Sequence, residues 1–110
     1  MALEQFEIGF ADYLGDRMGD APALVIACST GGRVDDQPAI ISANRFGNVL
    51  PAMWSFMLAA RARGLGTCWT TLHLIMEQQI ADILGIPFDD VTQAVLSPLA
   101  YTVGTDFRPA

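Results

Sequence analysis

Few side chains in this 110-residue chain could carry out chemistry by themselves. The single histidine, His73, and the two cysteines, Cys28 and Cys68, have no partner at a spacing that suits a metal site or a nucleophile–base pair. All six basic residues are arginines, which excludes Schiff-base and P-loop lysine chemistry within the chain. The acid pairs Asp35-Asp36 and Asp89-Asp90 are typical of solvated turns. The sequence therefore predicts no metal site. We expect His73 on a helix surface and both cysteines in buried structural positions.

Two glycine-containing segments could in principle bind phosphate. Ser29-Thr30-Gly31-Gly32 lacks Walker spacing and precedes no clear helix, so an ordinary turn is expected there. Gly64-Leu65-Gly66 begins like a dinucleotide-binding motif, but Trp69 stands at the third glycine position and the segment follows a helix. A Rossmann site is therefore not predicted.

The elements that must position these residues alternate between helix and strand. The hydrophobic pattern predicts an amphipathic helix over residues 3–18 that ends near Gly19, then a strand over 21–28 buried on both faces. Residues 29–38 are expected to form a loop. A second helix over 49–63 is apolar nearly all round, which indicates burial in a core or an interface, with Gly64 as its C′ residue.

The rest of the chain continues the alternation. A short extended piece over 67–69 leads to a third helix over 72–84, with Thr71 as N-cap and Gly85 after its last turn. A final strand is expected over 91–103, and Pro98 within it favours an edge position or a bulge. The order predicts an α/β sandwich in which helices pack on a small β-sheet, as a single domain over residues 1–110.

Composition excludes several classes of partner. The net charge of -6 argues against nucleic acid or an anionic membrane as the main partner. The longest apolar run, residues 49–60, is shorter than the roughly 20 residues that span a bilayer, and the N-terminus lacks the pattern of a signal peptide. We expect a cytoplasmic protein whose thiols are reduced.

Two motifs in order carry a family resemblance. The first motif is Leu58-Ala59-Ala60-Arg61-Ala62-Arg63-Gly64-Leu65-Gly66-Thr67-Cys68-Trp69-Thr70-Thr71, and the second is Ile80-Ala81-Asp82-Ile83-Leu84-Gly85-Ile86-Pro87. Together they resemble the C-terminal half of nitroreductase-family flavoenzymes. The resemblance implies a partial nitroreductase-like α/β sandwich and an intertwined homodimer. It also implies FMN-mediated hydride transfer from NAD(P)H to nitro or quinone-type acceptors.

The resemblance assigns site residues by position. The loop of Trp69, Thr70, Thr71 and Leu72 would lie against the flavin ring, and Arg108 is the candidate for the FMN phosphate. The chain departs from the family pattern in having Trp54-Ser55 where many members have Gln-Asn. It also has only Arg17 as a basic residue before Ala21, where the family has a basic cluster for the phosphate.

Three hypotheses remain open at this point. The first is an FMN-dependent oxidoreductase that is truncated, for which catalysis by the chain alone is not expected. The second is a flavin-free dimerisation or structural remnant of the same fold, which the mean hydropathy of +0.35 also suits. The third is a small module that binds an apolar ligand in a cavity.

Overall fold

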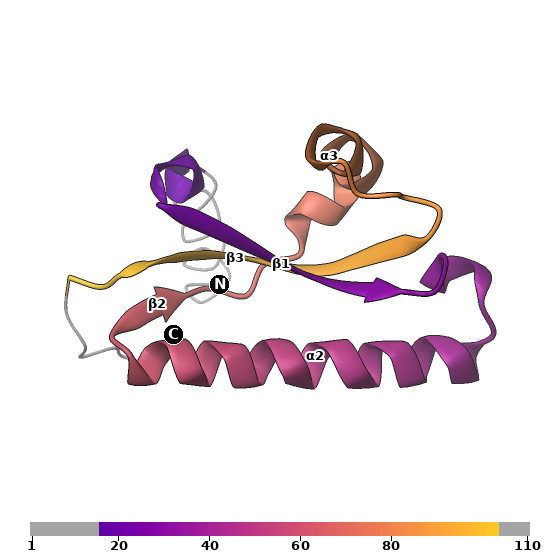
Figure 1. Cartoon of the computed structure of the whole chain (residues 1–110), viewed down its shortest axis with the longest axis horizontal. Helices are drawn as coiled ribbons and strands as arrows, with labels where there is room; N and C mark the ends of the chain where they lie inside the picture. Colours follow the sequence, from indigo (N-terminus) through magenta and orange to yellow (C-terminus); the bar gives the residue numbers. More distant parts are fainter. Residues whose placement is uncertain (1–15, 104–110) are drawn as a thin grey trace, which may run out of the picture.

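The computed structural model of the chain describes residues 16–103, and a three-stranded antiparallel sheet lies at their centre. The strand order is β1-β3-β2, with bounds β1 (Ala23–Thr30), β2 (Leu65–Thr67) and β3 (Val91–Tyr101). One long helix, α2 (Ala39–Ala62), covers one face of this sheet, as Figure 1 shows. On the opposite face lie the 3-10 helix η3 (Leu72–Met76) and the helix α3 (Glu77–Leu84). The predicted arrangement of helices on a small sheet is confirmed.

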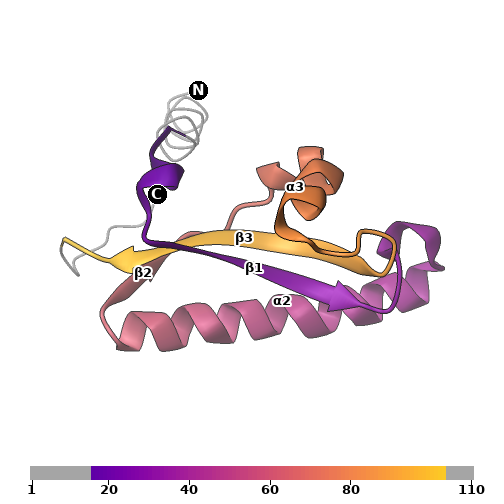
Figure 2. The ribbon, with the colours of Figure 1, turned by 45° about the horizontal axis from the view of Figure 1, so that its top comes forward.

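Two short 3-10 turns complete the described elements. They are η1 (Met18–Asp20), before β1, and η2 (Val34–Asp36), before α2. The helix predicted over 3–18 lies outside the described residues except for its last positions. Turning the molecule shows that α2 runs beneath the length of β1 and β3 (Figure 2).

The helix α2 packs through one stripe of side chains. Met53 is buried with Ala94 and Val95 of β3, and this cluster is flanked by Ala27, Phe46, Val49, Leu50 and Met57. The helix begins ten residues before the predicted start, because it continues through Pro51, whose missing N–H costs one intrahelical bond. It ends as predicted, with Gly64 at a positive φ of 80°.

The outer face of α2 is apolar as well. Trp54 and Leu58 lie four residues apart and are 55% and 54% exposed. A helix that is apolar nearly all round was expected to be buried in a core or an interface, but the described residues cover only one of its faces. Within residues 16–103, no helix combines the length and hydropathy needed to cross a membrane.

The strand β1 is shifted by two residues from its prediction and is less buried. Among residues 16–103 it pairs only with β3, and its side chains are half-buried or exposed, with Leu24 50% exposed. The expectation of burial on both faces was wrong. A continuous apolar run does not distinguish a central strand from an edge strand whose outer side is open.

The strand β3 occupies the centre of the sheet, so the edge position predicted from Pro98 was wrong. A bulge does occur in β3, but it lies at Ala94, where Ala27 pairs with Val95 and Cys28 pairs with Gln93. The extra residue changes the alternation of side chains. Gln93 consequently lies beside α3, while Val95 packs on α2.

The helix predicted over 72–84 forms in two parts, a 3-10 turn followed by an α-helix. Thr71 is the N-cap residue of the first part but makes no side-chain capping bond. Gly85 ends the second part in the left-handed conformation, with φ 74° and ψ 23°, and the N–H of Ile86 donates to the carbonyl of Ala81 at 2.9 Å.

The left-handed position of Gly85 leads to a prediction. Gly85→Ala should lower the free energy of unfolding by about 1 kcal/mol, because a Cβ is disfavoured at positive φ although space is available for it. Gly47→Ala, in the interior of α2 with open space around the new Cβ, should instead stabilise the chain by about 0.5–1 kcal/mol. Urea denaturation of both variants tests this, and equal shifts of the same sign would contradict it.

Candidate functional site

The loop from Cys68 to Thr71 follows β2 and pairs with the main chain of the central strand again at Thr70. Thr70 forms an isolated bridge with Leu96, donating its N–H to the Leu96 carbonyl at 3.0 Å and accepting the Leu96 N–H at 2.9 Å. The Thr70 hydroxyl donates to the same carbonyl at 2.6 Å. Thr70 therefore anchors the loop to β3, and its side chain is occupied by this anchoring.

The neighbours of Thr70 are open to solvent. Trp69 is 38% exposed, Leu72 is 67% exposed, and Thr71 is also exposed. The first bond of η3 runs from the Leu74 N–H to the Thr71 carbonyl at 3.0 Å. The N–H groups of Leu72 and His73 precede that bond, so the helix cannot satisfy them. The structure thus presents two apolar side chains and two backbone donors in one short segment.

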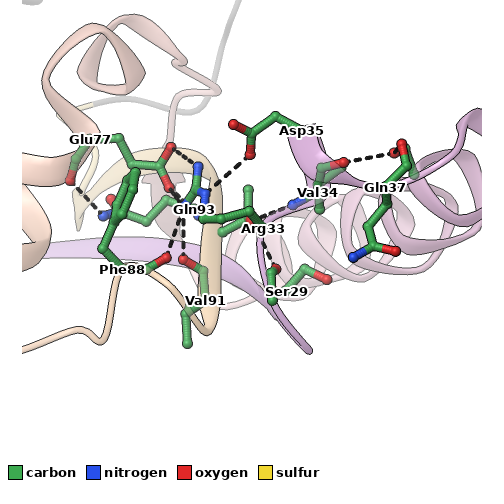
Figure 3. A network of polar contacts seen from close by, with 12 residues as sticks. Ser29, Arg33, Val34, Asp35, Gln37, Glu77, Phe88, Val91 and Gln93 are labelled. Carbon is green, nitrogen blue, oxygen red and sulfur yellow. Dashed lines mark hydrogen bonds and ion pairs between the residues drawn. The ribbon is translucent and has the colours of Figure 1, made fainter.

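A buried ion pair fixes the element that follows this loop. Arg33 NH1 and NH2 donate to Glu77 Oε2 and Oε1 at 2.8 and 2.9 Å, and both side chains are nearly buried, with 11% and 12% exposed. Two parallel bonds between guanidinium and carboxylate are the strongest geometry for such a pair. Figure 3 shows that this contact joins the segment before η2 to the start of α3.

The remaining hydrogen-bonding capacity of the pair is used by the main chain around it. Arg33 NH1 also donates to the carbonyls of Phe88 and Val91 at 3.1 and 3.0 Å, and its Cζ lies 3.9 Å from the centre of the Phe88 ring. The Gln93 N–H donates to Glu77 Oε2 at 3.0 Å, and Gln93 Nε2 donates to the Glu77 carbonyl at 3.3 Å (Figure 3). The network therefore joins α3 to β3 and to the loop after β1.

The electrostatics of the pair follow from this geometry. Hydrogen bonding from Arg33, supported by the Gln93 N–H, holds the pKa of Glu77 below its ordinary value of 4.5, although burial opposes the shift. The hydrogen bond to Glu77 likewise raises the pKa of Arg33. Both groups are charged at neutral pH, so Glu77 serves to hold α3 in place and is poorly suited to accept a proton.

His73 is more enclosed than predicted. Neither ring nitrogen has a hydrogen-bond partner within the described residues, and both are buried, so the expected surface role was wrong. Burial lowers the pKa of His73 below its ordinary value of 6.5, although the nearby Glu77 and Gln93 oppose the shift. Gln93 Oε1 is likewise buried without a bonded partner. The imidazole is therefore neutral at pH 7.

Both cysteines are partly buried and free, which agrees with the structural role expected for them. Burial raises the pKa of the Cys28 thiol and of the Cys68 thiol. Over residues 16–103, the His, Cys, Asp and Glu side chains form no group of three or more that could hold a metal ion.

The other candidate segments are explained by local structure. The N–H groups of Gly31 and Gly32 both donate to the Asp90 carbonyl, at 3.0 and 2.9 Å, so the turn is closed by the protein itself. Asp35 is exposed and accepts a bond from Arg33 Nε at 3.1 Å. The ordinary turn expected at residues 29–32 is therefore found at Gly31 and Gly32, whereas Ser29 and Thr30 belong to the end of β1.

Of the five predicted cofactor-binding residues, the structure places Trp69, Thr70, Thr71 and Leu72 in one loop at the start of η3. Arg108 lies outside the described residues. The sequence did not predict the network of Arg33, Glu77 and Gln93, because Arg33 and Glu77 are 44 residues apart along the chain. The one available signal was Glu77 itself, a lone acidic residue among the apolar residues that begin the third predicted helix.

Comparison with known proteins identifies the family. Neither a curated protein nor a solved structure matches the chain significantly. A family model described as the nitroreductase family matches residues 3–105, which is nearly the whole chain. Members of this family generally use a flavin and act as dimers with NAD(P)H, and membership indicates an oxidoreductase-type function. The chain therefore belongs to the nitroreductase family.

Proposed function

We propose that the chain is an FMN-dependent oxidoreductase that transfers hydride from NAD(P)H to nitro or quinone-type acceptors and acts as a homodimer. The observation that carries this proposal is the loop of Trp69, Thr71 and Leu72, which stands away from the sheet beside the N–H groups of Leu72 and His73. The family match over residues 3–105 supports it independently.

The described residues fit one part of FMN. A flavin ring needs an apolar wall and backbone donors at its polar edge, and this loop offers both. Trp69 and Leu72 would form the wall, and the N–H groups at the start of η3 would face the ring edge. Arg108 is the proposed phosphate ligand. When bound, FMN supplies the ability to accept and release a hydride, while the chain binds it, orients it and excludes water.

The titratable groups near the loop favour this division of roles. Glu77 is held as a carboxylate by Arg33, and His73 is neutral. Neither is arranged as a nucleophile with an adjacent base. Glu77 instead holds α3 against Arg33 and Gln93, and the chemistry belongs to the cofactor.

The homodimer is proposed from the outer face of α2. Its apolar side chains, with Trp54 and Leu58 at its centre, have no cover in a single copy of the described chain. The same face would also serve a flavin-free dimer, which is the second candidate function. Only cofactor binding separates the two candidates.

The proposed function is tested by titrating the purified chain with FMN and following flavin fluorescence, with the mass of the particle measured on the same sample. We expect saturable binding with a Kd of about 1 μM or tighter. Leu72→Asp should weaken binding at least about tenfold, because it places a carboxylate against the ring. Ile83→Asp introduces the same charge at another exposed apolar position, on α3 (82% exposed, against 67% for Leu72), and should leave binding unchanged.

The outcomes distinguish the hypotheses. A dimer that does not bind FMN would overturn the enzyme proposal and support the flavin-free scaffold. Equal weakening by both aspartate variants would show that the loop of Trp69–Leu72 is not the binding segment. A monomer that binds FMN would overturn the dimer proposal alone.

A further inference from the structure

The break between β2 and the candidate cofactor loop has a local cause in β3. The pairs Leu65↔Tyr101, Gly66↔Ala100 and Thr67↔Leu99 continue in the same register to the isolated bridge Thr70↔Leu96. This register places Cys68 opposite Pro98 and Trp69 opposite Ser97. The strand pairing is thus interrupted for two residues and then resumes without a shift.

Proline explains why the pairing stops there. Thr70 and Leu96 exchange both backbone bonds, so alternation along an antiparallel pair makes Cys68 and Pro98 the next hydrogen-bonded pair. Pro98 has no N–H and cannot donate to Cys68. One of the two bonds that would hold Cys68 in the sheet is therefore absent.

The Ser97 hydroxyl replaces the other bond. It accepts the Cys68 N–H at 2.9 Å and donates to the Pro98 carbonyl at 2.8 Å. The hydroxyl thus stands between the two groups that a direct strand bond would join. Ser97 is fully buried, so no solvent competes for these bonds. The loop is held away from β3 by one side-chain oxygen and is anchored again at Thr70.

We propose that Ser97, together with Pro98, is a positioning residue for the cofactor loop. Resting on the proposed function, the inference is that the Ser97 hydroxyl sets the offset from the sheet that brings Trp69, Thr71 and Leu72 to the flavin. Ser97 acts through Cys68. Its hydroxyl is bonded to the main chain and does not contact the cofactor.

The test separates positioning from stability. Ser97→Ala removes the spacer and leaves the Cys68 N–H without its partner. The double variant Ser97→Ala with Pro98→Ala removes the spacer but restores a backbone donor at position 98, so that direct pairing with Cys68 can close. Ser42→Ala is the matched control, since the Ser42 hydroxyl also donates to a carbonyl, that of Val34 at 2.9 Å, but holds η2 to α2.

Two measurements are made on each variant. The first is the Kd for FMN, and the second is the urea midpoint of the flavin-free chain. We expect Ser97→Ala to weaken FMN binding about tenfold and to lower the urea midpoint. In the double variant the midpoint should recover while FMN binding stays weak. Ser42→Ala should lower the midpoint with FMN binding unchanged.

A measurement without flavin tests whether Ser97 determines the position of the cofactor loop. In a Trp54→Phe background, Trp69 becomes the only tryptophan, and acrylamide quenching of its fluorescence reports its exposure without flavin. Ser97→Ala and the double variant should both change this quenching, and Ser42→Ala should not. Unchanged quenching would overturn the positioning role.

The binding data separate the two proposals. If the unmodified chain does not bind FMN, the proposed function fails and the positioning role fails with it. If the unmodified chain binds FMN and the double variant recovers both stability and affinity, Ser97 has only a structural role. If Ser97→Ala does not fold, the urea midpoint and the Kd for FMN of the double variant are compared with those of the unmodified chain, and this comparison decides between a positioning and a structural role.

Discussion

Glu77→Gln is expected to lower the free energy of unfolding by about 3 kcal/mol, because the change leaves the nearly buried Arg33 guanidinium with only the exposed Asp35 as a counter-charge. The glutamine keeps the size of the side chain, so packing changes little. The carboxylate accepts two bonds from Arg33 and one from the Gln93 N–H, and the glutamine amide has only one oxygen, without a negative charge, to replace both carboxylate oxygens. The start of α3 should loosen from β3 as a result.

Urea denaturation at pH 7 measures this effect. Asp20→Asn is the matched control, because Asp20 pairs with Arg17 at the same 2.8 Å but both side chains are more than half exposed. Exposed pairs contribute about 0–1 kcal/mol, so this control should shift the midpoint little. Similar shifts of the urea midpoint for the two variants would contradict the claim that burial makes the Arg33–Glu77 pair contribute more stability than the exposed Arg17–Asp20 pair.

The same carboxylate should make stability depend on pH. The folded chain holds the pKa of Glu77 below its ordinary value of 4.5, so the unfolded chain binds more protons as the pH falls through that region. The contribution of Glu77 is therefore complete above about pH 4.5 and is lost as the pH falls through the folded-state pKa. Glu77→Gln should flatten this part of the stability curve.

The second large effect is expected in the core beneath the sheet. Met53→Ala should lower the free energy of unfolding by about 3 kcal/mol, because Met53 is only 3% exposed and packs on Ala94 and Val95 at the bulge of β3. Truncation leaves a cavity that the flanking side chains of α2 can fill only in part.

Thermal and urea unfolding measure this loss, and Met76→Ala provides the control. Met76 is 54% exposed at the end of η3, so the same chemical change should cost well under about 1 kcal/mol there. A loss at Met53 no larger than that at Met76 would mean that α2 does not form the core as the structure places it.

The parts of the fold that depend on neighbouring residues were predictable. The end of α2 at Gly64 and the end of α3 at Gly85 follow from the tolerance of glycine for positive φ. The start of η3 at Leu72 follows from the amphipathic stripe that begins there. In each case the physical cause lies within a few residues of its effect.

The candidate site was only partly predictable. The residues of the loop were identified in the sequence, but the role of Thr70 as the anchor on Leu96 was not. His73 was predicted to lie on a helix surface because a lone histidine has no partner in the sequence to set its tautomer or pKa, whereas residues packed around it in space enclose both ring nitrogens. The pair of Arg33 and Glu77 depends on two segments that the sheet brings together.

The sequence by itself determined the α/β class, the ends of the helices at Gly64 and Gly85, and the residue types available for chemistry, but not the start of α2, which lies ten residues before its predicted position. Only the tertiary structure decided that β3 is central, that its bulge lies at Ala94, and that Ser97 compensates for Pro98. Helix stripes and glycine caps arise from local geometry, so they can be recognised along the chain. Strand order, register and buried ion pairs arise from contacts between distant segments, whose partners no single stretch of sequence specifies.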